Sequence, residues 1–201
     1  VNEDDKALRI VTSKLNVVIN KSPLRVRFEN RNGDVLNEDD AGLGTAWIGE
    51  QVTTYKKLQA EERFIGLGEN TGNLDRRGHQ YQNWTTDAYG YHGGQDPLYV
   101  STPFYIGIHH SSLYGIYFDN SYKTFFNFGA SNNRFSSFSA DAGEMNYYFI
   151  EGSTVSDIIQ NYTLLTGRMD MPPLWSLGYQ QSRYSYYPDK ELTTLQQTFR
   201  E

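Results

Sequence analysis

Short runs in which aromatic or aliphatic residues alternate with polar ones recur through residues 1–150, and they constrain the fold of this chain most strongly. The sequence contains 16 tyrosines and 11 phenylalanines, many of them in such runs. A period of two puts successive side chains on opposite faces of a β-strand, and aromatic residues favour strands. Runs spaced by about 10 residues predict a mainly β, antiparallel fold. Four of these runs lie at 103–109, 113–119, 122–128 and 145–150.

A hairpin is predicted near the N-terminus. Residues 24–28 alternate between apolar and charged side chains, Asn32 and Gly33 follow, and Val35 resumes an apolar run. Asn-Gly tolerates the positive φ angles that tight hairpin turns need. Together with the strand spacing, this pattern favours an antiparallel β-sandwich. A closed barrel alternates sides in the same way and stays an alternative.

The apolar period changes from two to that of a helix after residue 152. Thr154 is a candidate N-cap with Asp157 three residues later, and the apolar positions continue to Gly167. A threonine with an acidic residue at N3 is typical of a capping box, and glycine commonly ends a helix. We predict one helix that closes the sandwich.

A second unit is predicted after the helix. Met171-Pro172-Pro173 breaks the periodicity, and Leu174 to Arg183 indicates a strand. Asp189 is a candidate cap for a helix with Leu192, Leu195 and Phe199 on one face. A strand and a helix alone form no core, so we expect the first βα unit of a truncated domain. Without barrel partners, its apolar residues would fold back on the sandwich, pair with a second copy of the chain or remain disordered. The domains are expected at 1–168 and 169–201.

Composition excludes several classes of partner. The chain has 24 acidic and 18 basic residues, a net charge of −6, and no cysteine. We therefore expect no nucleic-acid partner, no thiolate metal site and no disulfide. No apolar run is long enough to span a membrane, so we expect a soluble chain without a membrane partner, of undetermined compartment.

Two short motifs are given structural interpretations. The glycines of 66–72 do not fit the dinucleotide-binding pattern and are predicted to lie in turns. His109 and His110 are neighbours in a predicted strand and point to opposite faces, so no metal site is assigned to them. We expect no cofactor.

Residues 81–99 are predicted to form a long loop rich in aromatic residues and glycine. Long loops in compact domains are often functional. A carboxylate among exposed aromatic rings suits a sugar, because the rings cover C–H faces and the carboxylate accepts hydroxyl protons. A surface loop that packs on itself is the alternative. The notable members are Trp84, Asp87, Tyr89, Tyr91 and His92.

Several segments, in their order along the chain, resemble glycoside hydrolase family 31. The first are Phe64-Ile65-Gly66-Leu67-Gly68-Glu69, Leu74-Asp75-Arg76-Arg77-Gly78, Trp84-Thr85-Thr86-Asp87-Ala88-Tyr89 and Pro103-Phe104-Tyr105-Ile106-Gly107. The later ones are Tyr114-Gly115, Phe118-Asp119-Asn120, Leu164-Leu165-Thr166-Gly167-Arg168, Pro172-Pro173-Leu174-Trp175-Ser176-Leu177-Gly178-Tyr179 and Arg183-Tyr184. They span nearly the whole chain.

The resemblance implies a galactose-mutarotase-like β-sandwich followed by a (β/α)8 barrel that carries catalysis. Active sites of such barrels lie at the carboxyl ends of the strands. By its place in the family pattern, Tyr184 would line the glucose pocket, with packing at the barrel rim as the alternative. Asp87 would lie near the bound sugar on a sandwich loop, and the alternative is a carboxylate that braces this loop.

The implied activity is that of a retaining α-glucosidase acting on terminal, non-reducing α-linked glucose of oligosaccharides, although α-xylosidases, lyases and transglucosylases also belong to the family. Retention needs two carboxyl groups about 5–5.5 Å apart. The family's nucleophile lies in a Trp-x-Asp-Met segment that this sequence lacks, and Met169-Asp170-Met171 precedes the barrel. We therefore assign no catalytic residue, expect the 201 residues alone to be inactive, and keep a free-standing carbohydrate-binding module as the alternative.

Overall fold

The computed structural model describes residues 1–110 and 112–201. The chain forms two compact units, Val1–Gly167 and Arg168–Glu201. Each unit is described by itself below. Among the described residues, no helix has both the length and the apolar character needed to cross a membrane.

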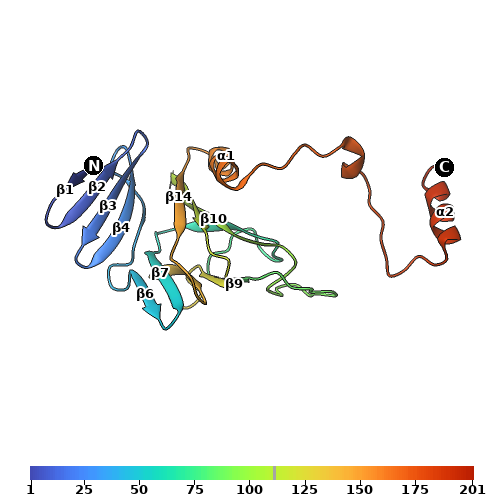
Figure 1. Cartoon of the computed structure of the whole chain (residues 1–201), viewed down its shortest axis with the longest axis horizontal. Helices are drawn as coiled ribbons and strands as arrows, with labels where there is room; N and C mark the ends of the chain where they lie inside the picture. The colour runs from blue at the N-terminus through green and yellow to red at the C-terminus, as the bar shows by residue number, and fades with distance from the viewer. Residues whose placement is uncertain (111) are drawn as a thin grey trace. The chain divides into compact units, whose positions relative to one another are not determined.

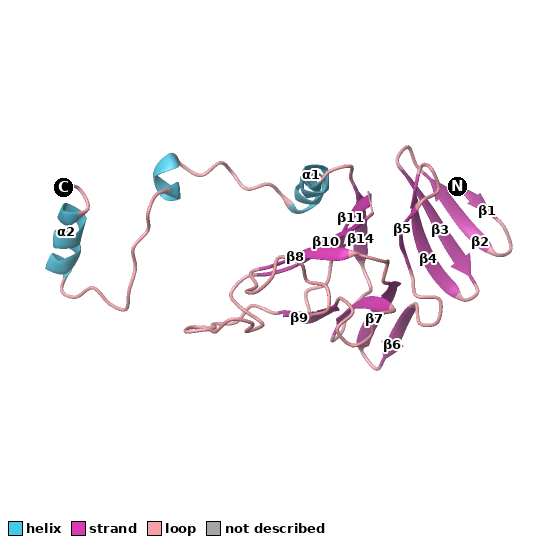
Figure 2. Ribbon diagram, turned by 180° about the vertical axis from the view of Figure 1, so that it is seen from behind, coloured by secondary structure: helices cyan, strands magenta, loops and turns pink. Residues whose placement is uncertain are grey.

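The first unit consists of three antiparallel sheets (Figures 1 and 2). The predicted mainly β, antiparallel fold is therefore confirmed. The first sheet has the order β1 (Asn2–Glu3), β2 (Ala7–Val11), β3 (Leu15–Lys21), β4 (Leu24–Asn30) and β5 (Val35–Glu38). The second has the order β6 (Thr45–Ile48), β7 (Gln51–Lys57), β13 (Phe135–Ala140), β12 (Thr124–Asn127) and β9 (Gln80–Asn83). The third has the order β14 (Tyr147–Glu151), β11 (Ser112–Phe118), β10 (Ser101–His109) and β8 (Arg63–Gly68).

The main core lies between the second and third sheets. Phe126 and Phe138 of the second sheet belong to the same buried cluster as Phe64 and Phe118 of the third. The rings of Phe118 and Phe138 are 5.2 Å apart. Buried residues alternate with more exposed ones along β13, so one face of the second sheet supplies the core, whereas β11 of the third sheet has three consecutive buried residues because both of its faces are covered. This arrangement is the predicted sandwich.

The predicted hairpin is formed by β4 and β5. Gly33, in its turn, has φ +88°, a conformation that glycine adopts without a steric penalty. Phe28 pairs with Asn37, and a bulge separates this pair from the next. The prediction of a hairpin turn from the Asn32-Gly33 pair is therefore confirmed.

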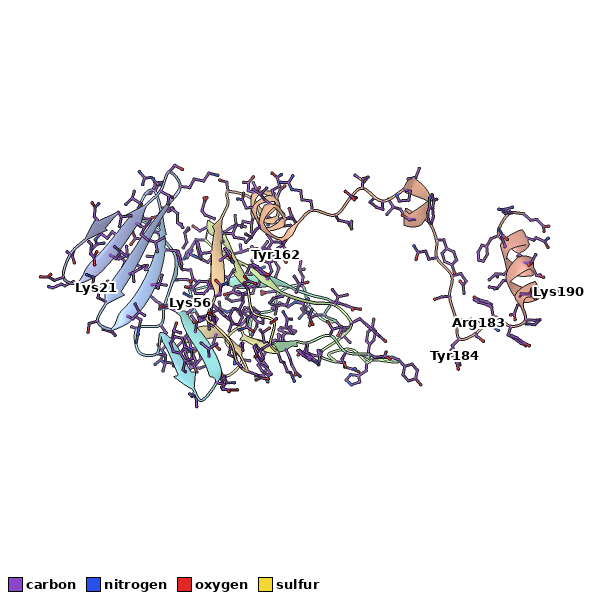
Figure 3. All side chains as sticks on the ribbon, viewed as in Figure 1. Lys21, Lys56, Tyr162, Arg183, Tyr184 and Lys190 are labelled. Atoms are coloured by element: carbon purple, nitrogen blue, oxygen red, sulfur yellow. The ribbon has the colours of Figure 1, made fainter. Side chains whose placement is uncertain are left out.

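A buried ion pair connects the sheets. Lys56, labelled in Figure 3, lies on β7. It donates to the Asp39 carboxylate at 2.6 Å and to the Tyr147 hydroxyl at 3.0 Å. The Lys56 side chain is fully buried. Burial alone would lower the pKa of Lys56, but the neighbouring Tyr147 and Asp39 raise it above its usual value. Asp39 follows β5, and Tyr147 is on β14, so one ammonium group holds parts of all three sheets.

The predicted closing helix is α1 (Val155–Thr166). Thr154 and Asp157 form the capping box, with the Thr154 Oγ1 accepting from the Asp157 amide at 3.1 Å. Ile158 is fully buried, and the ring of Tyr162 stacks on Phe104 at 3.9 Å. The helix therefore covers the outer face of the third sheet.

The second unit differs in part from its prediction. The strand expected from Leu174 to Arg183 is wrong, because this segment contains a short 3₁₀ helix, η1 (Leu174–Leu177), and then irregular chain. A parallel strand needs a neighbour to complete its hydrogen bonds, and none pairs with this segment among the described residues. The helix predicted after it is α2 (Asp189–Thr198). Its N-cap is Pro188 rather than Asp189, and no side chain caps it.

Candidate functional site

The long aromatic segment forms a loop between β9 and β10, which we name the aromatic loop (residues 84–100). It extends away from the strands of the second and third sheets (Figures 1 and 2). Its start differs from the prediction, because Gln80–Asn83 pair with β12 as strand β9. The partner strand, Thr124–Asn127, lies more than 40 positions away in the sequence. The pattern of residues 81–83 alone therefore does not predict that they form a strand.

Two glycines of β8 shape the C-terminal end of the aromatic loop. They were predicted in turns, but Gly66 (φ +125°) and Gly68 (φ +78°) lie within the strand. A Cβ atom on Gly68 would approach the Val100 carbonyl oxygen to 2.5 Å. The pairing of β8 with β10 shifts register between Ser101 and Tyr105. These glycines therefore serve a β-bulge and a close approach of two backbones at the end of the loop.

Hydrogen bonds fix the aromatic loop at several points. The Thr86 amide donates to the Leu98 carbonyl at 3.0 Å, and the Gly94 amide donates to Thr71 Oγ1 at 2.7 Å. The Val100 amide donates to the Glu69 carboxylate at 3.2 Å. Leu98 is only 2% exposed, so it anchors the loop in the domain. The loop is thus a braced structure with a small apolar base.

Above this base, the aromatic loop presents its rings to solvent. Trp84 is 49% exposed, and Tyr89 is 91% exposed. Tyr91 and Tyr99 pack edge to face with ring centroids 6.5 Å apart. Because these rings are already held in place, a ligand could pack on their apolar surface without the entropy cost of ordering the loop on binding.

Asp87 is exposed and lies beside Tyr99. Partial desolvation, then the charge and hydrogen-bonding of Asp87, raise the pKa of the Tyr99 phenol, and Glu69 adds to this effect. Two carboxylates and a neutral phenol thus supply acceptors and a donor among the rings. The structure brings Asp87 and Tyr99 together, which the sequence did not predict, although both lie in the segment that it singled out.

A pocket of about 300 Å³ lies at the start of the aromatic loop. Trp84 and Thr85 line it together with Tyr122 and Asn120, which come from the connection between β11 and β12. Sequence reasoning placed Tyr122 only on a strand face and missed this role. The signal was present in the family segment Phe118-Asp119-Asn120, which ends two residues before Tyr122.

Tyr184 lies in the second unit (Figure 3). Its side chain is fully exposed. The preceding Arg183 pairs with Glu191 of α2 at 3.3 Å and lies over the ring of Tyr186 at 4.9 Å. The segment around Tyr184 is therefore tied to α2 through its neighbour.

Only His109 of the predicted strand pair lies in a strand, because β10 ends there and His110, with φ +50°, lies in a turn. His109 is buried, and its Nε2 lies 2.7 Å from the Leu36 carbonyl oxygen. Beneath it, the Tyr114 hydroxyl donates to Glu62 at 2.6 Å, and burial raises the pKa of Glu62. Across residues 1–110 and 112–201, no three His, Asp or Glu side chains are grouped as metal ligands.

Comparisons with known proteins agree with this architecture. Residues 1–127 match the model of the glycosyl hydrolase 31 N-terminal galactose mutarotase-like domain. Alpha-glucosidase 2 of Bacillus thermoamyloliquefaciens is 41% identical over 201 residues, covering 99% of this chain and 25% of the relative. An alpha-glucosidase of Saccharolobus solfataricus is 34% identical over 173 residues, covering 86% of this chain and 25% of the relative.

A solved structure extends the agreement to the fold. A Flavobacterium johnsoniae GH31 dextranase, as a variant complexed with isomaltotriose, superposes with a TM-score of 0.92 at 40% identity. The alignment covers 99% of this chain and 24% of the dextranase. The chain thus spans about a quarter of the length of the relatives it matches. By the match over residues 1–127 and the identity to these glycosidases, the chain belongs to the N-terminal galactose mutarotase-like domain family of glycoside hydrolase family 31.

Proposed function

We propose that this chain is the N-terminal portion of a retaining α-glucosidase that releases terminal, non-reducing α-linked glucose from oligosaccharides. The observation that carries the proposal is the 41% identity across 99% of the chain to an α-glucosidase of which it covers 25%. The dextranase complexed with isomaltotriose supports the same class of ligand, an oligomer of α-linked glucose.

In this proposal the sandwich, residues 1–168, is a scaffold, and residues 169–201 begin a (β/α)8 barrel. A retaining mechanism requires two carboxyl groups about 5–5.5 Å apart. In this proposal both of them, the nucleophile and the acid/base, belong to later barrel segments. The Trp-x-Asp-Met segment of the family is absent from the sequence. The barrel is thus the partner that the chain needs, and the 201 residues alone are inactive.

Asp87 and Tyr184 are the residues proposed to contact the sugar. The exposed Asp87 carboxylate, beside the Tyr99 phenol, is suited to accept hydroxyl protons of a glucose residue. The exposed ring of Tyr184 is suited to cover an apolar C–H face. Both contacts would stabilise bound substrate and leave the covalent chemistry to the barrel.

The test is steady-state kinetics on a longer polypeptide that contains this segment followed by its barrel. We expect glucose release from maltose or isomaltose with retained α configuration, and we expect Asp87→Asn to lower kcat/KM by about tenfold or more. Asp34→Asn, in the β4–β5 turn, is the matched control and should leave both constants unchanged. Glucose release by the 201-residue chain alone, or an unchanged kcat/KM in Asp87→Asn, would contradict the proposal.

A second candidate function is a free-standing carbohydrate-binding module. The braced aromatic loop, with Trp84 and Tyr89 exposed, favours it. Titration of maltose or isomaltose into the 201-residue chain separates the two candidates. Binding that is lost in Asp87→Ala supports the module, whereas no binding at the loop supports a pocket completed by the barrel.

A further inference from the structure

A groove of about 580 Å³ lies on the outer face of the second sheet, opposite the sandwich core. We name it the sheet groove. Its volume is within the range of small-molecule sites. Side chains alternate along the strands, so β7 buries Val52, Thr54 and Lys56 and turns Thr53 and Tyr55 to the outside. The groove therefore uses the face of the sheet that the core does not use.

The register of four strands arranges the groove in two rows of cross-strand neighbours. Adjacent strands lie ~4.8 Å apart, so each row spans ~14 Å, which suits a short oligosaccharide. The two inner positions on β13 are serines, and larger side chains follow them on β12 and β9. The first row is Thr53, Ser139, Phe125 and Gln82, and the second is Tyr55, Ser137, Asn127 and Gln80.

The chemistry of the sheet groove is nearly neutral. Of the described residues that line it, Asp96 alone carries a charge. Its carboxylate accepts the Gln82 backbone amide at 2.6 Å. Burial raises the pKa of Asp96, and this hydrogen bond from Gln82, followed by the charge of the nearby Lys123, partly offsets the rise. Phosphate and nucleic-acid ligands need a cluster of cations, so the groove does not suit them.

Four polar side chains of the groove are free to bind a ligand, whereas Asn127 and Asp96 already make hydrogen bonds within the domain. Asn127 is engaged with its own turn, where it donates to Ser131 at 2.9 Å. In the part of the chain that the structure describes, no intramolecular hydrogen bond engages the side chains of Gln80, Gln82, Ser137 or Ser139. Two glutamines and two hydroxyls thus face the same hollow beside the half-buried rings of Phe125 and Tyr55.

The first sheet has a strand face of different composition. It carries ion pairs, Lys21 with Glu3 at 2.7 Å at exposed positions and Arg27 with Glu29 at 2.6 Å at part-buried ones. Such charged residues are the usual surface composition of a soluble domain. The sheet groove replaces them with amides, hydroxyls and two aromatic rings, which is the composition that recognises a neutral polyol.

We infer that the sheet groove binds a neutral oligosaccharide at a site separate from Asp87. Phe125 and Tyr55 pack against C–H faces of the sugar rings, while glutamine and serine side chains bond their hydroxyls. The choice of α-linked glucose oligomers as the first probe rests on the proposed function. The inference of a sugar site rests only on the shape and lining residues of the sheet groove.

The experiment is an amide NMR titration of the 201-residue chain with isomaltotriose, maltotriose and the β-linked cellotriose. We expect saturable shifts in β7, β9, β12 and β13 at millimolar sugar. Ser137→Lys fills the groove without removing a packed side chain, and Phe125→Ala removes a ring. Each should weaken binding about tenfold. Ser13→Lys, in the β2–β3 turn, and Tyr148→Ala, an exposed ring on β14, are matched controls that should bind like the parent chain.

Asp87→Ala separates this inference from the proposed function, since it should leave these shifts intact. Equal binding of all three sugars would support the inference that the sheet groove binds an oligosaccharide, and it would contradict a preference for α-linked glucose. No binding of any sugar, or shifts confined to residues 84–100 that vanish in Asp87→Ala, would overturn the inference. Because Ser137→Lys leaves the core untouched, the test stands even where Phe125→Ala fails to fold.

Discussion

The two units of the chain contain one α-helix each, and the helices differ in what covers their apolar faces. In α1, Ile158 is fully buried against the cluster formed with Phe104 and Ile106. In α2 no residue is buried, and Leu192 and Phe199 are 50% and 61% exposed. The sequence pattern of apolar residues is helical in both segments. The rest of the first unit buries the apolar face of α1, whereas in the second unit the ring of Tyr179 lies 5.5 Å from that of Phe199 and leaves Phe199 more than half exposed.

This difference shows how much of the stability of each helix comes from its own sequence and how much from packing against the rest of its unit. Most helix stability in proteins comes from packing of the apolar face, and caps add to it. Helix α1 has both a capping box at Thr154 and a buried face, whereas α2 begins at Pro188 without a side-chain cap. The same substitution is therefore expected to cost more in the first unit than in the second.

The largest expected effect is at the buried lysine. Lys56→Met leaves the Asp39 carboxylate buried without its partner, so it should lower the free energy of unfolding by about 3–5 kcal/mol. Lys190→Met, on the exposed surface of α2, should change it by less than about 0.5 kcal/mol. Denaturant unfolding of the 201-residue chain, followed by near-UV circular dichroism, measures both.

Alkaline pH sharpens the same comparison. Because the folded-state pKa of Lys56 is raised above 10.5, its stabilising contribution is fully present below that pH and is lost as pH rises through the folded-state pKa. The gap in stability between the parent chain and Lys56→Met should thus be constant from neutral pH to about pH 10 and narrow above it. Lys21→Met, which breaks an exposed ion pair, is the control. A large loss of stability in Lys21→Met would contradict the claim that the effect of Lys56→Met arises from burial of the ion pair.

The next effect concerns the packed face of α1. Ile158→Ala opens a cavity beneath the helix and should cost about 2–5 kcal/mol. Leu192→Ala removes a side chain of similar size from α2 and should leave thermal unfolding of the first unit nearly unchanged. Calorimetry of the two variants measures the contrast. Equal losses would show that α2 is packed in solution against a surface of the chain.

A smaller effect is expected at the helix cap. Thr154→Ala removes the oxygen that accepts the Asp157 amide and should cost about 1 kcal/mol. Asp189→Ala is the matched change at the start of α2, where no side chain caps the helix, and it should cost less. Denaturant midpoints of the two variants provide the measurement, and a reversed order would contradict the cap assignment.

What sequence reasoning predicted correctly is local. The hairpin at Gly33 and the capping box at Thr154 each depend on residues a few positions apart. The strand expected from Leu174 was wrong, since a strand is defined by a neighbour that the pattern does not contain. Gly66 and Gly68 were read as turn residues for a similar reason, because their approach to β10 is set by pairing.

The candidate sites show the same limit. The aromatic loop was recognisable because its rings and Asp87 are close in sequence. Its neighbours Tyr122 and Glu69 come from other segments, so they were missed as parts of it. The sheet groove was not predicted at all. Its rows join residues from β7, β9, β12 and β13, and only the register of these strands brings their outward side chains together.

The smallest effect on the first unit is expected from cutting the chain between the units. Residues 168–171 are exposed and irregular, and within the described chain their backbone groups make no hydrogen bond. Trypsin should therefore cleave first after Arg168, because exposed irregular segments are cut before hydrogen-bonded strands. The product, residues 1–168, keeps every buried residue of the core and of α1. Its Tm should stay within about 1 °C of that of the whole chain.

Arg168→Gln is the control for this cleavage, and it should move the first cut to Arg183 or beyond in the second unit. Mass spectrometry of early time points identifies the sites, and calorimetry of the purified product gives its Tm. A first cut within β1–β14 would contradict the expected order of cleavage. A Tm that falls by many degrees on release of residues 169–201 would show that the second unit stabilises the first. Such a result would erase the contrast between a helix that is packed and one that is not, because α2 would then contribute to the same cooperative core as α1.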